Sequence, residues 1–129
     1  MGKSYLVGSD AINVVKVDFY YTDPFIQPEL NVGIYRLATI EEIIAMKIDV
    51  IQRGGRKKDF WDLHELLDKY SISRMISLHR LRYPYSHEED VIRANFVNFD
   101  RADEELDPIC LKGKYWEYIK EDFVIALSQ

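Results

Sequence analysis

The stretch from Thr39 to Tyr70, TIEEIIAMKIDVIQRGGRKKDFWDLHELLDKY, constrains the fold of this chain more than any other. Thr39 followed three positions later by Glu42 forms a capping box, which begins a helix. Isoleucines then recur near the helical period, so one face of this helix is expected to be buried. Gly54-Gly55 predicts its end, because glycine readily adopts the left-handed conformation of a C-terminal cap. The segment therefore predicts two helices joined by a short glycine turn, antiparallel or steeply crossed, at about residues 39–53 and 57–69.

Charged residues stand at defined places on these two helices. Lys47 lies at the edge of the apolar stripe of the first helix, and Asp59 and Asp62 lie one turn apart at the start of the second. We therefore expect Lys47 and Asp62 to face a common groove, with Asp18 on its wall. A simpler interpretation is also open. In it, Lys47 buries the aliphatic part of its side chain and keeps its ammonium hydrated, and the two aspartates complement the helix dipole.

The flanking segments predict an α+β fold. Ser4–Val7 and Val14–Tyr20 are rich in β-branched and aromatic residues, and the turn residues Gly8 to Asp10 between them predict a hairpin. A short strand follows at about 32–37. Capping serines and apolar spacing predict further helices at about 73–82, 87–96, 99–105 and 115–127, with Ser71 or Ser73 and then Ser86 as caps. The expected fold is a single domain, residues 1–129, with a small antiparallel sheet (the N-terminal hairpin plus one strand) in residues 1–38 and a helical bundle in 39–129.

Composition excludes several classes of protein. The formal net charge of −5 argues against a generally basic nucleic-acid binder, although Arg53 to Lys58 include a local basic patch. No apolar run approaches the roughly 20 residues of a membrane span, and no signal peptide is evident. The single cysteine, Cys110, excludes an internal disulfide, so the cytoplasm is the default location. Cys110 itself is expected to be a small buried hydrophobe, and the three histidines to be structural or surface residues.

Asp18 is the acidic residue of the second predicted strand. Alternation along the strand places Lys16, Asp18 and Tyr20 on one face. This face is either a solvent-facing polar stripe or a site where Asp18 ligates a metal ion.

The string AMKIDVIQRGGRKKDFWDLHELL resembles the signature segment of the nucleotidyltransferase AbiEii/AbiGii toxin family. In that family a helix with an Ala-x-Lys element leads, through an Arg-Gly-rich turn, into a Lys/Arg-Asp-x-x-Asp-Leu element. The matching residues are Lys47, Arg53, Lys58, Asp59, Asp62 and Leu63. The resemblance covers most of this chain, but only the later part of a usual family member. The family's Gly-Ser motif followed by an Asp-x-Asp pair is absent, since no Asp-x-Asp follows Gly8-Ser9.

The resemblance implies a partial nucleotidyltransferase fold, in which residues 1–38 are the remnant of the catalytic sheet. It implies nucleotide transfer from a nucleoside triphosphate to an RNA acceptor in complete relatives, with Mg²⁺ as the metal and a cognate antitoxin as partner. Asp62 and Asp18 would be the catalytic acids, and Asp18, which resembles the family's third acid, would be the metal ligand. Nucleotide binding would fall to Lys47, Arg53, Lys58 and Asp59.

Three interpretations remain open at this point. The chain is a shortened member of the family, inactive alone because the acid pair is missing. Alternatively it is a non-catalytic binding module, or a split half that needs a separate N-terminal polypeptide. In the third interpretation it is a structural domain whose Lys-Asp pair is an ordinary ion pair. We further expect weak binding of nucleotide or RNA, and a homo-oligomer formed through the uncovered edge of the N-terminal strands.

Overall fold

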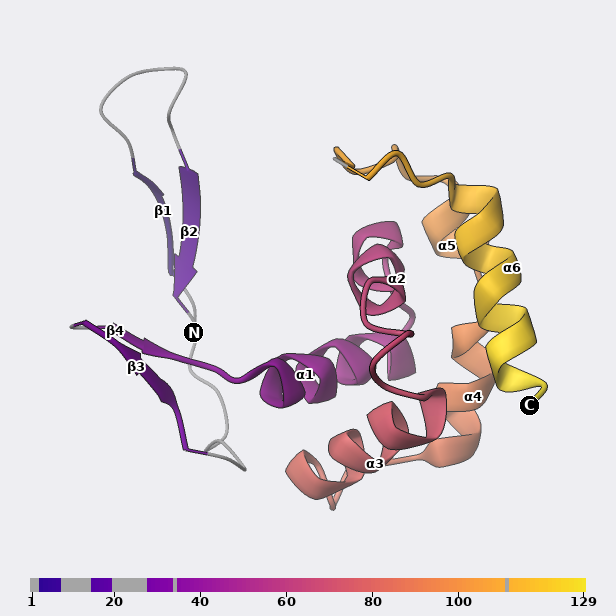
Figure 1. The fold of residues 1–129 in the computed structure, drawn as a ribbon, viewed down its shortest axis with the longest axis horizontal. Helices are drawn as coiled ribbons and strands as arrows, with labels where there is room; N and C mark the ends of the chain where they lie inside the picture. The colour runs from indigo at the N-terminus through magenta and orange to yellow at the C-terminus, as the bar shows by residue number, and fades with distance from the viewer. Residues whose placement is uncertain (1–2, 8–14, 20–27, 34, 111) are drawn as a thin grey trace.

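The computed structural model describes residues 3–7, 15–19, 28–33, 35–110 and 112–129. For residues 3–7, 15–19, 35 and 36 it describes the backbone alone. Two β-hairpins precede a group of six helices within these residues, and Figure 1 shows the hairpins on one side and the helices on the other. The expected helical part is thus confirmed, whereas the expected sheet is not.

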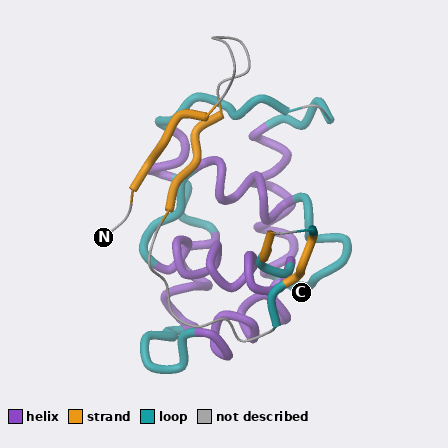
Figure 2. Tube along the Cα trace, turned by 90° about the vertical axis from the view of Figure 1, so that its left-hand side faces the viewer, coloured by secondary structure: helices purple, strands orange, loops and turns teal. Residues whose placement is uncertain are grey.

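The strands form two separate ladders instead of one small sheet. β1 (Lys3–Val7) pairs antiparallel with β2 (Val15–Phe19), in the register Lys3↔Phe19 to Val7↔Val15. The N-terminal hairpin is therefore present, although its expected turn at Gly8 to Asp10 and the loop at residues 20–27 lie outside the described residues. No hydrogen bonds join this ladder to the second hairpin among the described strands. Figure 2 shows the two ladders from the side, apart from each other.

The prediction of one strand at residues 32–37 was wrong. The chain turns there, giving β3 (Leu30–Val32) and β4 (Tyr35–Leu37) as an antiparallel pair. Gly33 has a φ of 61°, a left-handed conformation that glycine adopts without steric cost. An apolar run interrupted by glycine is therefore a tight hairpin and not a continuous strand.

The helices lie close to their predicted positions. They are α1 (Ile40–Gln52), α2 (Lys57–His64), α3 (Ile72–Arg82), α4 (Glu89–Phe96), α5 (Asp100–Asp103) and α6 (Trp116–Leu127). Thr39 caps α1 by accepting from the Glu42 N–H at 3.2 Å, and Ser71 caps α3 by accepting from the Arg74 N–H at 3.1 Å. Figure 1 shows α2 rising steeply from the end of α1, as the short glycine turn requires.

Two helix boundaries differ from the prediction. α2 ends at His64, five residues early, and the chain continues to Tyr70 as a series of turns, with the Leu67 N–H donating to the His64 carbonyl at 3.2 Å. Ser86 does not cap α4, since the helix begins after Glu88 and no side chain caps it. The Ser86 carbonyl accepts instead from the Gln52 side chain at 2.8 Å, which fastens this loop to the end of α1.

The hydrophobic core lies between the helices. It is built from the buried faces of α1, α2, α3, α4 and α6, and its largest fully buried side chains are Phe60, Phe96, Phe123 and their aliphatic neighbours. One buried ion pair joins α1 to α3: Arg82 Nη1 donates to Glu42 Oε2 at 2.6 Å, with both side chains fully buried. Removing one partner of such a pair leaves the other charge buried and uncompensated, which typically lowers the free energy of unfolding by about 3–5 kcal/mol. This pair therefore fixes how α3 lies on α1.

Candidate functional site

The structure brings together three of the residues singled out in the sequence. The Lys47 ammonium on α1 lies 3.0 Å from Asp59 Oδ1 and 3.0 Å from Asp62 Oδ2, both on α2. The helical register explains the meeting, because Asp59 and Asp62 are one turn apart and present both carboxylates to the same point on α1. The side chains of Lys47 and Asp62 thus meet, whereas the expected groove with Asp18 on its wall stays a prediction.

The two aspartates differ in how they are held. The Asp59 side chain is 5% exposed, and its Oδ2 also accepts from the Arg56 backbone N–H at 3.2 Å, at the start of α2. The Asp62 side chain is 58% exposed. Asp59 is therefore a fixed support for Lys47, whereas Asp62 is an outer partner in contact with solvent.

Electrostatics keep Lys47 charged. Burial acts to lower the pKa of Lys47, but hydrogen bonds and charge attraction from Asp59 and Asp62 outweigh it, so the pKa lies above its ordinary value. A lysine that stays protonated at neutral pH is an anion-binding group and cannot act as a general base.

The turn before α2 is tightly built. Gly54 has a φ of 98°, and its carbonyl accepts from Arg101 Nη1 at 3.0 Å. A side chain at Gly55 would collide with Ile51 and would stand 3.1 Å from Phe60. The Gly54-Gly55 turn therefore sets the approach of α2 to α1, which places the aspartates beside Lys47.

The basic loop is largely neutralised by neighbouring acids. Arg53 pairs with Asp49 at 3.0 Å, and Arg56 pairs with Glu105 at 2.9 Å. Lys57 is buried. Its ammonium donates to the Glu105 carbonyl at 2.6 Å and pairs with Asp107 at 3.0 Å. The Lys57 N–H donates to Glu105 at 3.0 Å and is the main cause that holds the pKa of Glu105 below its usual range; burial opposes it, and the Arg56 contact adds to the lowering.

Lys58 differs from its neighbours. Its side chain is exposed, and it has no ion-pair partner among the residues whose side chains are described. Of the four basic residues at the turn, Lys58 alone thus offers a cation without a described acid beside it. The expectation of a local basic patch at this turn is weakened accordingly.

The described side chains do not make a magnesium site. They contain no group of three or more histidines, cysteines or acids placed to hold a metal ion. Both carboxylates near Lys47 already bind its ammonium, and an adjacent cation opposes a second one by charge repulsion. Asp18 lies in β2, paired with Ser4, and its side chain is outside the described part. Its predicted metal and catalytic roles therefore stay predictions.

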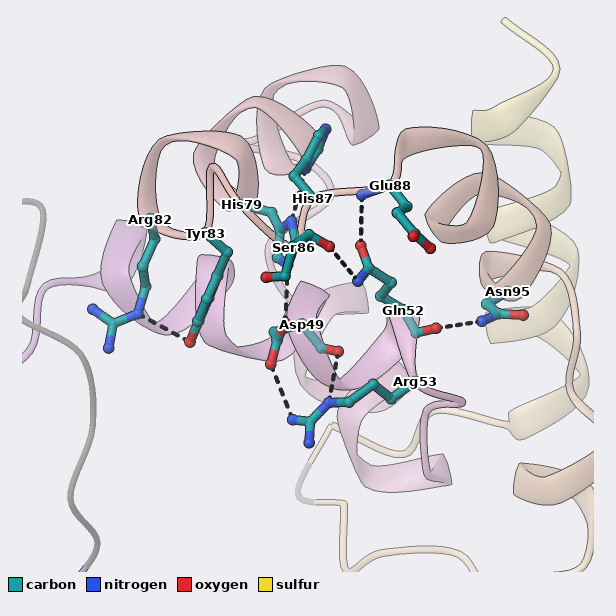
Figure 3. Close-up of polar contacts among 10 residues, drawn as sticks. All are labelled: Asp49, Gln52, Arg53, His79, Arg82, Tyr83, Ser86, His87, Glu88 and Asn95. Atoms are coloured by element: carbon teal, nitrogen blue, oxygen red, sulfur yellow. Dashed lines mark hydrogen bonds and ion pairs between the residues drawn. The ribbon is translucent and has the colours of Figure 1, made fainter.

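Sequence reasoning missed a second polar cluster, centred on a fully buried histidine (Figure 3). His79 Nε2 lies 3.1 Å from Asp49 Oδ1, and His79 Nδ1 lies 2.8 Å from Nδ1 of His87. Burial lowers the pKa of His79, against the raising effect of Asp49 and with a further lowering by His87. The general expectation of a structural histidine holds for His79, but its partners lie 30 and 8 residues away and no local motif indicates them.

These observations define a helical protein with a lysine held between two aspartates across a glycine turn. The family model "Nucleotidyl transferase AbiEii toxin, Type IV TA system" matches residues 4–128. The chain therefore belongs to this family of type IV toxin–antitoxin nucleotidyltransferase-like proteins. No curated protein and no solved structure matches the chain. Within the part that the structure describes, no helix is both long and apolar enough to cross a membrane.

Proposed function

We propose that Lys47, Asp59 and Asp62 form the phosphate-binding side of a nucleotidyltransferase site. The observation that carries this proposal is the unequal support of Lys47, which has one buried acidic partner and one exposed one. A triphosphate oxygen that approaches from solvent replaces Asp62 at the ammonium, while Asp59 keeps the lysine in place. The membership in a nucleotidyltransferase toxin family supports this assignment over an ordinary ion pair.

The displaced Asp62 carboxylate then has a second task. It lies within reach of whatever binds at Lys47, and a free carboxylate next to a nucleotide is placed to accept the proton of an attacking hydroxyl. For complete relatives the family implies an RNA hydroxyl as the acceptor. Lys58 and Arg53 at the adjacent turn add charge contacts, with Arg53 first having to leave Asp49.

Taken alone, this chain should not transfer nucleotides. Its 129 residues hold no Asp-x-Asp pair, and Asp18 by itself is a weak ligand for Mg²⁺, which prefers several oxygen ligands. Without the ion, charge on the transferring phosphoryl group loses a stabilisation of several kcal/mol. Incubation with labelled nucleoside triphosphates, total RNA and Mg²⁺ or Mn²⁺ should give no incorporation above background. Robust labelling that Asp62→Asn abolishes would contradict the prediction of inactivity.

Binding without turnover tests the site itself. Isothermal titration with a nucleoside triphosphate should show weak affinity that falls with added salt, because the contacts are mainly ionic. Lys47→Ala should remove most of the binding. Lys69→Ala, which removes an exposed lysine from the turn after α2, is the matched control and should leave it unchanged. An affinity that changes neither with added salt nor with Lys47→Ala would refute the proposed site.

A second candidate function is an interaction module that completes, or is completed by, another polypeptide. Large apolar side chains at the second hairpin and the start of α1 favour it, since Leu30, Leu37 and Ile40 are each about half exposed. The candidate partners are the cognate antitoxin or a polypeptide that carries a Gly-Ser motif followed by the Asp-x-Asp pair, which this chain lacks. Co-expression with the neighbouring reading frames followed by size exclusion separates these two. A chain that co-purifies with neither product would leave the phosphate site as the better assignment.

A further inference from the structure

The loop that joins α3 to α4, residues 83–88, is fastened to the end of α1 by one side chain (Figure 3). Gln52 donates to the Ser86 carbonyl at 2.8 Å and accepts from the Glu88 backbone N–H at 2.9 Å. Both hydrogen bonds are exposed, so water competes for them. An attachment of the loop inside the protein therefore has a large effect on whether the loop stays in place.

That attachment is a pair of histidines. Nδ1 of His87 in the loop lies 2.8 Å from Nδ1 of His79, whose side chain is fully buried on α3. The ring centres are 5.0 Å apart, so the two nitrogens lie near the line that joins the rings. On its other side, His79 Nε2 lies 3.1 Å from Asp49 Oδ1. A carboxylate can only accept, so His79 carries its proton on Nε2, and the proton between the two Nδ1 atoms belongs to His87.

The charged and titratable groups around this pair come from α1, α3 and the loop itself. Among the described residues they are Asp49, Arg53, Arg82, Tyr83 and Glu88. Arg82 is already balanced by Glu42 at 2.6 Å, and Asp49 is shared, because its Oδ2 pairs with Arg53 at 3.0 Å. The exposed Glu88 is screened by water. The buried side of the pair therefore has one shared carboxylate to set against positive charge on the two rings.

The pair accepts one additional proton without losing its contact, but not two. The first can reside on Nε2 of His87, and the His87 Nδ1–H then still donates to His79. A second proton, on Nδ1 of His79, leaves two N–H groups facing each other at 2.8 Å and two like charges on neighbouring rings, which repel. Burial already holds the pKa of His79 below its ordinary value, against the raising effect of Asp49 and with a smaller lowering by His87. His87 is half-buried and has solvent to turn into, whereas His79 is enclosed.

We propose that His79 and His87 form an acid-sensitive latch on the loop at residues 83–88. With no more than one added proton, the contact between the two Nδ1 atoms holds the loop on α3. When His79 takes up the second proton, this contact breaks, His87 turns to solvent, and the loop and the start of α4 lose its support. The open loop binds one proton more than the closed one, so the latch is closed at neutral pH and opens as the pH falls. The opening is local and precedes unfolding of the helices.

Amide hydrogen exchange of the whole chain, followed by NMR between pH 7.5 and pH 5 and corrected for the intrinsic rate, measures this opening. The reporter is the Glu88 N–H, which Gln52 protects while the latch is closed. The Ile48 N–H, in the buried middle of α1, reports global unfolding. The opening constant at Glu88 should rise about tenfold for each unit that the pH falls through the titration of His79, because opening takes up one proton. Glu88 should stay less protected than Ile48 at every pH.

Two variants test the role of the histidine pair. His87→Gln offers both a donor and an acceptor, so its amide can contact His79 in either protonation state, and the pH dependence at Glu88 should largely disappear. His64→Gln is the matched control, because His64 pairs with Asp122 on α6, and it should keep the full dependence. Exchange at Glu88 that does not change with pH overturns the proposal. Equal protection of Glu88 and Ile48 overturns the local opening, and a full pH dependence in His87→Gln overturns the role of the pair.

Discussion

At the scale of single residues, Asp59 and Asp62 contact the same ammonium but should differ in their effect on stability. Asp59→Asn removes a buried negative charge, on a carboxylate that also accepts from the Arg56 N–H. The half-buried ammonium of Lys47 then has less negative charge beside it to offset its loss of hydration. The expected loss in free energy of unfolding is about 1–3 kcal/mol. Asp62→Asn changes an exposed pair that water screens, so its loss should stay below about 1 kcal/mol. Urea unfolding of the two variants measures the difference, and equal losses would show that Asp59 is not the supporting partner.

The same residues show what a sequence reveals about side-chain contacts. The meeting of Lys47 with Asp62 is predictable, because helical spacing and a short turn leave few other arrangements. Glu42 is different. The capping-box pattern predicts a local role for it at the start of α1, but its carboxylate binds Arg82, which is 40 residues away. Such partners depend on how α3 packs on α1, and no local pattern encodes that packing. The predicted role of Asp18 rests on the resemblance alone.

At the scale of elements, the link from α3 to α1 through His79 predicts a pH dependence. His79 is fully buried between Asp49, His87 and the ring of Tyr83, and its pKa lies below the ordinary value of about 6.5. Above that pH the histidine is neutral in both states, so its contribution to stability is complete. As the pH falls below about 6.5, the unfolded chain binds a proton that the folded chain resists, and stability decreases.

Thermal unfolding at pH 7.5 and pH 5.5 tests this sign. The melting temperature should drop at the lower pH, and His79→Gln, which cannot titrate, should reduce the size of the drop. His64→Gln is the control, because His64 pairs with Asp122 at 2.7 Å on α6, away from this cluster. A melting temperature that rises on acidification would contradict the assignment of His79 as a buried neutral histidine.

The elements themselves were predictable to different degrees. Capping residues and apolar stripes located α1, α3 and α6 within two residues at each end, since those signals are local. α2 was overestimated because Leu66 and Leu67 continue its apolar pattern, although the chain there is already in turns. The second hairpin was missed because the single Gly33 was not recognised as its turn. Each error arose where one residue type suits two conformations.

At the scale of the whole molecule, the N-terminal hairpin predicts self-association. Among the described residues, β1 and β2 pair with each other and with no third strand, so within that part of the chain each has one edge of unpaired backbone groups. A lone two-stranded ladder is marginally stable in water, and an open edge is a template for a strand of another chain. A second copy of the same hairpin is the simplest complement, because pairing about a two-fold axis satisfies both edges alike. We therefore expect a dimer or larger assembly joined through β1 and β2.

Light scattering coupled to size exclusion measures the assembly, and a pair of variants locates the interface. Val17→Lys places a charge in the middle of β2, where it disfavours edge-to-edge pairing, and should shift the protein to monomer. Val97→Lys places the same charge at an exposed position just after α4 and should leave the assembly unchanged. The wild-type mass should fall on dilution, since pairing is concentration-dependent. A wild-type protein that stays monomeric at high concentration would mean that the hairpin edges are covered within one chain, and it would weaken the interpretation of residues 1–38 as the remnant of a larger catalytic sheet.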